Sequence, residues 1–157
     1  RAFEHVDVAL ADPPAGLDDL DARRGSDAIP ALERDGVTLY DVMARSEGDG
    51  NAAEWTRGFP RTFREADRIL DGDGSVLDRA SRAFLRLLAG EEDGFVRQQS
   101  GPEAAREATR RAQACLDGEE DPERMAEEFV ARGINPGTTA DITCGALYVA
   151  LERGLSV

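Results

Sequence analysis

Apolar residues recur at helical spacing along most of the chain from residue 28 onwards. Steps of three and four residues separate them, and glycine, proline and acidic residues interrupt the pattern at short intervals. The expected helical stretches are residues 28–34, 38–46, 51–70, 76–89, 102–116, 122–133 and 135–153. The sequence shows no ladder of alternating strands, internal repeat or coiled-coil heptad. It therefore predicts an all-α fold, a compact multi-helix bundle around a buried C-terminal helix.

Local signals set several of the expected helix boundaries. Thr38 and Ser75 are residue types that cap helix N-termini, and each precedes a helical stretch. Gly58 and Pro60 interrupt residues 51–70. Because an internal proline removes a backbone hydrogen bond and clashes with the preceding turn, we expect two helices that meet at a bend near Gly58.

Three segments need a separate interpretation. Residues 90–100 are expected to form a loop. Residues 2–11 alternate in part like a strand but also fit a helix, which we favour. Residues 71–75, DGDGS, resemble the opening of a calcium loop, but Val76 and Arg82 stand where such a loop needs glycine and glutamate. We therefore expect an acidic turn there and no calcium site.

The last helical stretch carries the most sequence information. Asn135 is expected to cap a long helix, with Pro136 at its first position. From residue 140 to 151 the side chains are nearly all apolar, although Asp141 is among them. A helix that is apolar nearly all round is enclosed by others. We expect it to be the hub of the bundle.

Thr138, Asp141, Gly145 and Tyr148 fall at steps of three and four residues and share one stripe of this helix. A buried carboxylate needs a partner. In one interpretation Asp141 is structural and bonds to Thr138 or to an arginine of a neighbouring helix. In the other, a nucleotide binds at the start of the helix and Asp141 lies directly behind it.

The second interpretation relies on the first turn of the helix, where free backbone N–H groups favour anions. A carboxylate close to a phosphate is tolerable only with a cation between them or a ribose hydroxyl to bond, which implies Mg²⁺. The candidate nucleotide-binding residues are Asn135, Gly137, Thr138 and Thr139. Asp141 is the candidate catalytic residue and magnesium ligand.

Charge is the most unusual feature of the composition. All 19 basic residues are arginine, while aspartate and glutamate total 32, for a net charge of −13. An acidic surface without lysine is typical of proteins that stay soluble at very high salt, so we expect a halophilic protein. The hydrophobic fraction of 41% and the helical periodicity argue against disorder. The charge also argues against nucleic acid or an anionic membrane as a partner.

Cys115 and Cys144 sit in apolar helical contexts and are expected to be small buried thiols in a reducing cytoplasm. His5 stands alone and cannot make a histidine metal site. No apolar run approaches ~20 residues and no signal peptide is visible, so we expect a cytoplasmic protein. The 157 residues fit a single domain. Because the chain begins with Arg1, we expect it to be the C-terminal part of a longer protein.

Five short motifs occur in a familiar order: LYDVM at 39–43, EW at 54–55, GF at 58–59, FVR at 95–97 and NPGTTAD at 135–141. Together they resemble the C-terminal half of the triphosphoribosyl-dephospho-CoA synthase family, particularly its archaeal branch. NPGTTAD is the most specific of the five. The proline and glycine run at 12–16 is similar to a degenerate form of the family's NPGGLG-like segment.

The resemblance implies an all-α, ATP-binding transferase. It would move the triphosphoribosyl group of ATP onto the ribose 2′-hydroxyl of 3′-dephospho-CoA, or of a related acceptor, with release of adenine. Asp141 would take a carboxylate role or associate with Mg²⁺. Because the chain has no lysine, side-chain contacts to phosphate must come from arginines, and Arg97, Arg57 and Arg61 stand beside aromatic residues and glycines. Trp55 either packs in the core at the helix bend or stacks on adenine.

Two alternatives stay open beside the enzyme. The family's N-terminal motifs, a proline-glycine motif and a Thr-His-Lys-Gly-like segment, are absent, so catalysis is expected of the full-length protein. A non-catalytic helical module that holds a nucleotide or a CoA-like ligand is the first alternative. The second is a helical interaction domain in which Asp141 is structural.

Overall fold

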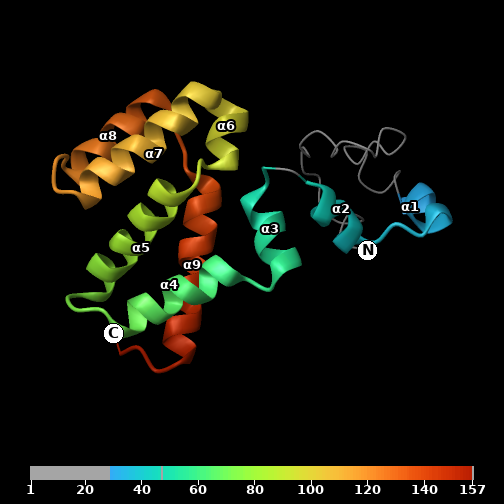
Figure 1. Ribbon diagram of the computed structural model, residues 1–157, viewed down its shortest axis with the longest axis horizontal. Coiled ribbons are helices and arrows are strands. Elements are labelled where there is room, and N and C mark those ends of the chain that lie inside the picture. The colour runs from blue at the N-terminus through green and yellow to red at the C-terminus, as the bar shows by residue number, and fades with distance from the viewer. Residues whose placement is uncertain (1–28, 47, 157) are drawn as a thin grey trace. The chain divides into compact units, whose positions relative to one another are not determined.

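The computed structural model describes residues 29–46 and 48–156, in which every regular element is a helix (Figure 1). The helices are α1 (Ile29–Asp35), α2 (Leu39–Arg45), α3 (Gly50–Arg57), α4 (Pro60–Asp71), α5 (Val76–Gly90), α6 (Gly94–Ser100), α7 (Pro102–Leu116), α8 (Pro122–Arg132) and α9 (Gly137–Glu152). The predicted all-α class is confirmed. The helix predicted at 2–11, His5 and the segment at 12–16 lie outside the described residues.

The chain divides between Gly48 and Asp49 into two compact units. α1 and α2 belong to the first unit and α3 to α9 to the second. The single domain over residues 1–157 stays a prediction. Among the helices of the described residues, none is long and apolar enough to cross a membrane.

The predicted caps and the predicted bend are confirmed. Thr38 and Ser75 each form a capping box, in which the side chain accepts a hydrogen bond from the third helical residue and that residue's carboxylate accepts one in return. Gly58 ends α3 in the left-handed conformation at φ 77°, and Pro60 occupies the first turn of α4. A glycine adopts this conformation without steric cost, and the first helical position tolerates proline.

The prediction of a loop over residues 90–100 is wrong, because residues 94–100 form α6. Its N-cap is Asp93, whose Oδ1 accepts hydrogen bonds from the backbone N–H groups of Phe95 (2.9 Å) and Val96 (3.1 Å). A helix of two turns shows little periodicity in the sequence. Val96, which is fully buried, anchors this helix in the core.

The helix predicted to start at Asn135 begins at Gly137 instead. Pro136 holds the N-cap position without a side-chain cap bond, and Asn135 is exposed. The cap role predicted for Asn135 is therefore wrong. The buried carboxylate of Asp93, which lies outside the helix, caps the first turn instead of Asn135. The Oδ2 atom of Asp93 accepts hydrogen bonds from the N–H and the hydroxyl of Thr139, both at 2.7 Å.

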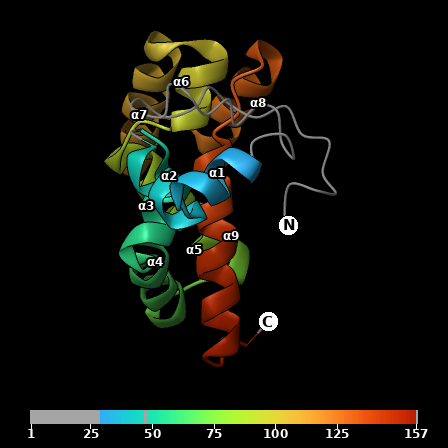
Figure 2. The same ribbon diagram turned by 90° about the vertical axis from the view of Figure 1, so that its right-hand side faces the viewer.

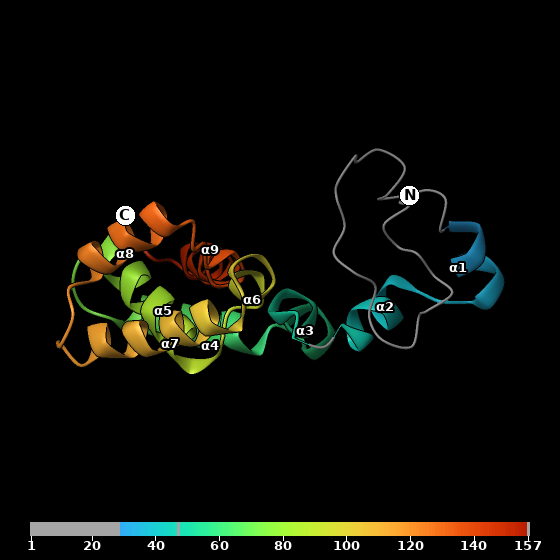
Figure 3. The same ribbon diagram turned by 90° about the horizontal axis from the view of Figure 1, so that it is seen from above.

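α9 runs along the second unit and packs against α4, α5, α3 and α6 (Figures 1 and 2). In Figure 3 it is seen nearly end-on, with α3 and α8 on opposite sides. α5 separates two hydrophobic clusters. On one side it packs with α6, α7 and α8 around Leu88, Val96 and Phe129. On the other, Ala83 meets Ile69 of α4 and Ala146 of α9.

The prediction that α9 is enclosed all round is wrong for one face. Ile142, Ala146 and Ala150 are buried, as the apolar pattern predicts. Asp141 and Tyr148, by contrast, are exposed. Composition alone did not reveal this face, because which side of a helix stays open depends on where its neighbours lie.

The two cysteines differ in their surroundings. Cys115 is buried, and its Sγ lies 3.8 Å from Sδ of Met125. Burial raises the pKa of the Cys115 thiol, with a smaller contribution from Glu120. Cys144 is exposed on the open face of α9, so the prediction of burial is confirmed for Cys115 and wrong for Cys144.

Candidate functional site

A cavity of about 470 Å³ opens beside the exposed face of α9, between this helix and the pair α3 and α4. We call it the aromatic groove. Its lining residues are Asn51, Glu54, Trp55, Phe59, Thr62, Phe63, Asp141, Ile142, Gly145, Tyr148 and Val149. Sites for small molecules usually have volumes of roughly 300 to 1,000 Å³ and combine apolar walls with a few polar groups. Three residues of the predicted stripe, Asp141, Gly145 and Tyr148, lie in this groove.

Aromatic side chains form one wall. The ring centroids of Trp55 and Phe59 are 5.2 Å apart, and those of Phe59 and Phe63 are 6.4 Å apart, both in edge-to-face geometry. Trp55 is 63% exposed, so its interpretation as a core residue at the helix bend is wrong. Such a row leaves ring faces available for stacking with a flat ligand.

Phe59 holds an unfavourable backbone conformation within this wall. Its φ of 59° lies in the left-handed region, and Phe59 is the one non-glycine residue with positive φ among those described. For a bulky residue this costs on the order of 1–3 kcal/mol, and such strain gathers at functional sites. The geometry turns the chain sharply from α3 into α4 and places the Phe59 ring between its two aromatic neighbours.

Glu54 stabilises the turn between α3 and α4 by accepting hydrogen bonds from the first turn of α4. It is 3% exposed, and its Oε2 accepts hydrogen bonds from the N–H (2.9 Å) and the hydroxyl (2.8 Å) of Thr62. Its Oε1 accepts from Nε of Arg61 at 3.0 Å and from the Arg61 N–H at 3.3 Å. Glu54 thus satisfies the first-turn donors of α4 that lack a cap of their own.

Burial and hydrogen bonding act in opposite directions on the pKa of Glu54. Burial raises it, but hydrogen bonds from Thr62 and Arg61 favour the ionised carboxylate and outweigh burial, so the pKa is lowered overall. Arg61 is fully engaged in the same network, since it also bonds Glu91 (2.6 Å) and the Gly50 carbonyl (2.7 Å). Arg61, one of the arginines predicted to contact phosphate, therefore has a structural role in this network.

Asp141 lies at the mouth of the groove. The prediction that it is buried is wrong, and its partner is neither Thr138 nor an arginine: its Oδ2 accepts a hydrogen bond from Nδ2 of Asn51 at 2.8 Å. Within the described part of the chain no salt bridge engages this carboxylate, so Oδ1 is open to a ligand in the groove. A carboxylate oriented by one amide can accept a proton or bind a hydroxyl.

The first turn of α9 is less open to an anion than expected. The Thr139 N–H bonds Asp93, and the Gly137 N–H bonds the Asn135 carbonyl at 2.8 Å. A buried carboxylate at a helix N-terminus also neutralises the partial positive charge there. Two of the three backbone N–H groups predicted to bind an anion are therefore already engaged. The nucleotide-binding role of Asn135, Gly137, Thr138 and Thr139 stays a prediction.

The other predicted arginines lie outside the groove lining. Arg97 is exposed on α6 and pairs with Glu92, and Arg57 is exposed at the end of α3. The structure therefore brings neither into contact with Asp141. Their proposed role in phosphate binding stays a prediction.

Three residues that build the site escaped the sequence reasoning. Asn51 was only the start of a predicted helix, although it orients Asp141. Glu54 entered only as part of the EW motif, although it is the anchor of the turn. At Gly50 a Cβ atom would lie 2.8 Å from Cγ2 of Thr138 and 2.9 Å from Nη2 of Arg61. Gly50 thus allows α3 to approach the start of α9, which no local pattern in the sequence indicates.

The groove has few groups that could bind a metal ion. In the portion of the chain that the structure describes, no group of three or more His, Cys, Asp or Glu side chains could hold a metal ion. Asp141 offers one open carboxylate oxygen. Mg²⁺ is often bound by one or two carboxylates together with substrate phosphates, and Asp141 fits that mode of binding.

Comparisons with known proteins give a matching family and a solved structure with a similar fold. Residues 1–156 match the family model described as ATP:dephospho-CoA triphosphoribosyl transferase. Among solved structures, the fold is similar to that of a protein from Archaeoglobus fulgidus whose assignment as a triphosphoribosyl-dephospho-CoA synthase is itself provisional. The TM-score is 0.73 at 24% sequence identity, and the match covers 88% of this chain and 62% of that protein. Among curated proteins, none matches the chain.

Proposed function

The chain belongs to the ATP:dephospho-CoA triphosphoribosyl transferase family, and from that membership we propose that its aromatic groove binds ATP for transfer of the triphosphoribosyl group. The acceptor in this proposal is the ribose 2′-hydroxyl of 3′-dephospho-CoA or a related molecule, and adenine is released. Because the chain spans 62% of the solved relative, the proposal concerns the full-length protein.

One observation carries the proposal: an exposed aromatic row and an oriented carboxylate line the same groove. Trp55, Phe59 and Phe63 offer ring faces and edges to a purine, while Asp141 and Asn51 offer polar groups to a ribose. Trp55, Phe63 and Tyr148 are exposed aromatic side chains that gather in this one groove. This pairing suits a nucleoside better than a wholly apolar or wholly charged ligand.

The reaction exchanges one bond at the anomeric carbon of ATP. The C1′–N9 bond breaks, adenine leaves with its electron pair and takes up a proton, and the acceptor oxygen bonds to C1′. Asp141 accepts the proton of the attacking hydroxyl through its open oxygen, and Asn51 holds the carboxylate in orientation. The same negative charge stabilises the oxocarbenium-like carbon between bond breaking and bond formation.

Mg²⁺ enters this proposal with the nucleotide. When bound, it would neutralise charge on the phosphates. In the alternative role of Asp141, its open oxygen would bind this Mg²⁺ instead of accepting the hydroxyl proton. The chain's own part is to present a carboxylate beside the phosphates and to keep the base against the aromatic wall.

Trp55→Ala tests the nucleotide-binding half of the proposal. Stacking of a base on an aromatic side chain contributes about 1–3 kcal/mol, so we expect the variant to bind ATP about 5- to 150-fold more weakly, as measured by calorimetry. Leu77→Ala is the matched control, because Leu77 is an exposed apolar residue outside the groove. Equal ATP affinity in the Trp55 variant and the wild type would contradict binding of the base at this wall.

Trp55 also reports binding directly, since it is the single tryptophan of the chain. ATP should change its fluorescence saturably, whereas inorganic tripolyphosphate, which has no base, should not.

A further inference from the structure

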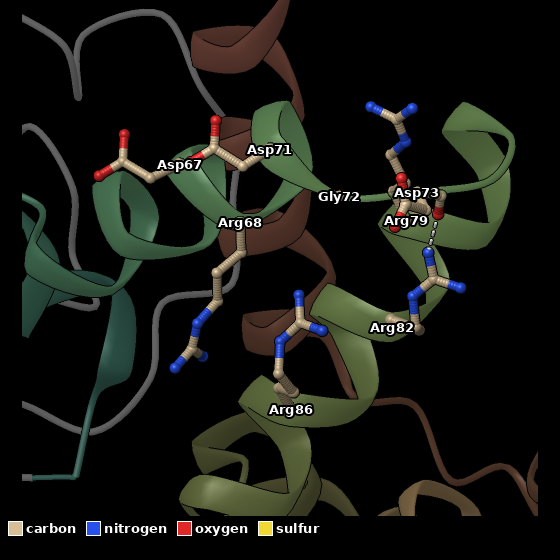
Figure 4. A pocket seen from close by; sticks show the side chains of 8 residues that line it. All are labelled: Asp67, Arg68, Asp71, Gly72, Asp73, Arg79, Arg82 and Arg86. Atoms are coloured by element: carbon tan, nitrogen blue, oxygen red, sulfur yellow. Dashed lines mark hydrogen bonds between the residues drawn. The ribbon is translucent and has the colours of Figure 1, made fainter.

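A second cavity, of about 720 Å³, lies between the C-terminal half of α4, the turn that follows it and one side of α5. We call it the arginine cavity. It shares no lining residue with the aromatic groove. Four of its lining side chains are arginines: Arg68, Arg79, Arg82 and Arg86 (Figure 4). In a chain whose acidic residues far outnumber its basic ones, such a concentration of guanidinium groups calls for a physical explanation.

A buried carboxylate organises two of the four arginines. Glu65 is fully buried, and its Oε1 accepts a hydrogen bond from Nη1 of Arg68 at 2.7 Å. Its Oε2 accepts from Nε of Arg86 at 2.8 Å. Among the described contacts Arg86 thus uses only its inner nitrogen, and its two terminal nitrogens extend into the cavity (Figure 4). Guanidinium groups fixed in this way lose little further entropy when they bind a ligand.

The other two arginines pair with backbone carbonyls. Arg79 donates from Nε to Gly74 O at 3.0 Å and from Nη1 to Ile69 O at 3.2 Å. Arg82 donates to the carbonyl of Asp73. Neither arginine has a salt bridge with any carboxylate of the described residues. Carbonyl partners fix their positions but do not neutralise their charge.

The carboxylates near the cavity cancel only part of this charge. Asp67 pairs with Arg153, and Figure 4 shows the carboxylates of Asp67 and Asp71 directed away from the Arg68 guanidinium. Glu65, Asp71 and Asp73 remain to balance four arginines, which leaves about one positive charge on the wall. The cavity is therefore a local exception to the acidic surface.

We propose that the arginine cavity binds a chain of phosphate groups. Guanidinium groups bond phosphate oxygens in pairs, and several fixed forks along one wall suit a di- or triphosphate better than a single small anion. The proposal does not depend on the transferase reaction, because the cavity is separate from the aromatic groove.

The phosphate chain has two chemical sources: the triphosphate of a nucleotide held in the groove, or a free polyphosphate. The two cavities are close along α4, where Phe63 lines the groove and Asp67, one turn later, lines the arginine cavity. Arg153 bridges them, because its guanidinium lies 5.4 Å from the Phe63 ring centre and pairs with Asp67.

Titration calorimetry of the protein with inorganic tripolyphosphate in 1 M KCl tests the proposal. Long-range attraction is screened beyond about 3 Å at this salt concentration, so binding requires direct contacts. We expect Arg82→Gln to weaken binding about tenfold or more, since a hydrogen bond to a charged group is lost. Arg68→Gln is a second variant with the same expectation. Arg110→Gln, which removes an exposed arginine of α7 outside both cavities, should bind like the wild type.

Each result of this titration either supports or overturns the proposed phosphate site. Weaker binding in both cavity variants supports the site; competition by ATP then assigns the phosphate chain to the nucleotide, and no competition assigns it to a free polyphosphate. Trp55→Ala should leave tripolyphosphate binding unchanged, so failure of the groove proposal would not be mistaken for failure here. Absence of binding to the wild type, or equal weakening by Arg110→Gln, would overturn the proposal.

Discussion

Asp141→Asn is expected to lower the rate of adenine release by about 10²- to 10⁴-fold, which is the usual contribution of a general base. The amide keeps the size of the side chain but cannot accept the proton of the attacking hydroxyl. Asp141 is exposed and bonds one side chain, Asn51. Exposed substitutions usually change stability by no more than about 0.5 kcal/mol, so the melting temperature should stay within about 2 °C of the wild type.

Glu152→Gln is the matched control for this variant. Glu152 is an exposed carboxylate on the same helix that does not line the groove, so the same loss of charge there should leave the rate unchanged. A fully active Asp141→Asn variant would show that the carboxylate has no chemical role. A large fall in melting temperature would instead support the structural interpretation of Asp141.

Glu54→Ala is expected to destabilise the protein by about 3–5 kcal/mol, with a fall in melting temperature of roughly 10 °C or more. The substitution leaves the first-turn donors of α4 and the guanidinium of Arg61 without their buried partner. It also removes the support for the left-handed Phe59, so the aromatic wall should lose its geometry. Thermal or denaturant unfolding measures the effect.

Glu91→Ala is the control, because Glu91 is the other carboxylate that Arg61 contacts and is largely exposed. An exposed ion pair contributes about 1 kcal/mol or less. Similar losses in the two variants would contradict the anchoring role of Glu54.

The Glu54 contribution should also depend on pH. Its pKa in the folded protein is lowered, so the unfolded state takes up the proton first as the pH falls. The stabilisation is therefore complete above the ordinary glutamate pKa of about 4.3 and is lost as the pH falls through the lower folded-state value. The stability difference between wild type and Glu54→Gln should shrink over that acid range. A constant difference would contradict the ionised carboxylate as the cause.

Helix positions were predictable wherever the signal is local. The Thr38 and Ser75 caps, the break at Gly58 and the proline at the start of α4 each act within a few residues. α6 and the start of α9 were not predictable in this way. α6 has a local cap in Asp93, but its two turns show too little periodicity to predict a helix. The start of α9 depends on the same Asp93, which reaches across 46 positions to Thr139, and a bond of that range leaves no periodic trace in the sequence.

The sequence predicted several residues of the candidate site, but it did not predict how they are arranged in space. Asp141 and Tyr148 were placed on one stripe, and the structure has both in the groove. The sequence could not show that this stripe faces an opening, because burial depends on how α3 and α4 pack against α9. Trp55 illustrates the same point, since an aromatic residue at a helix bend is usually buried but here forms the wall of a cavity.

Triphosphoribosyl transfer by this protein can be followed by chromatography of the adenine released by the full-length protein with ATP, Mg²⁺ and 3′-dephospho-CoA in molar KCl. We expect adenine only when ATP and the acceptor are both present, and we expect the Asp141→Asn variant to lose this activity. Adenine released at the same rate without the acceptor would contradict transfer to it. Absence of adenine, while ATP still changes the fluorescence of Trp55, would show a nucleotide-binding groove that does not catalyse this reaction.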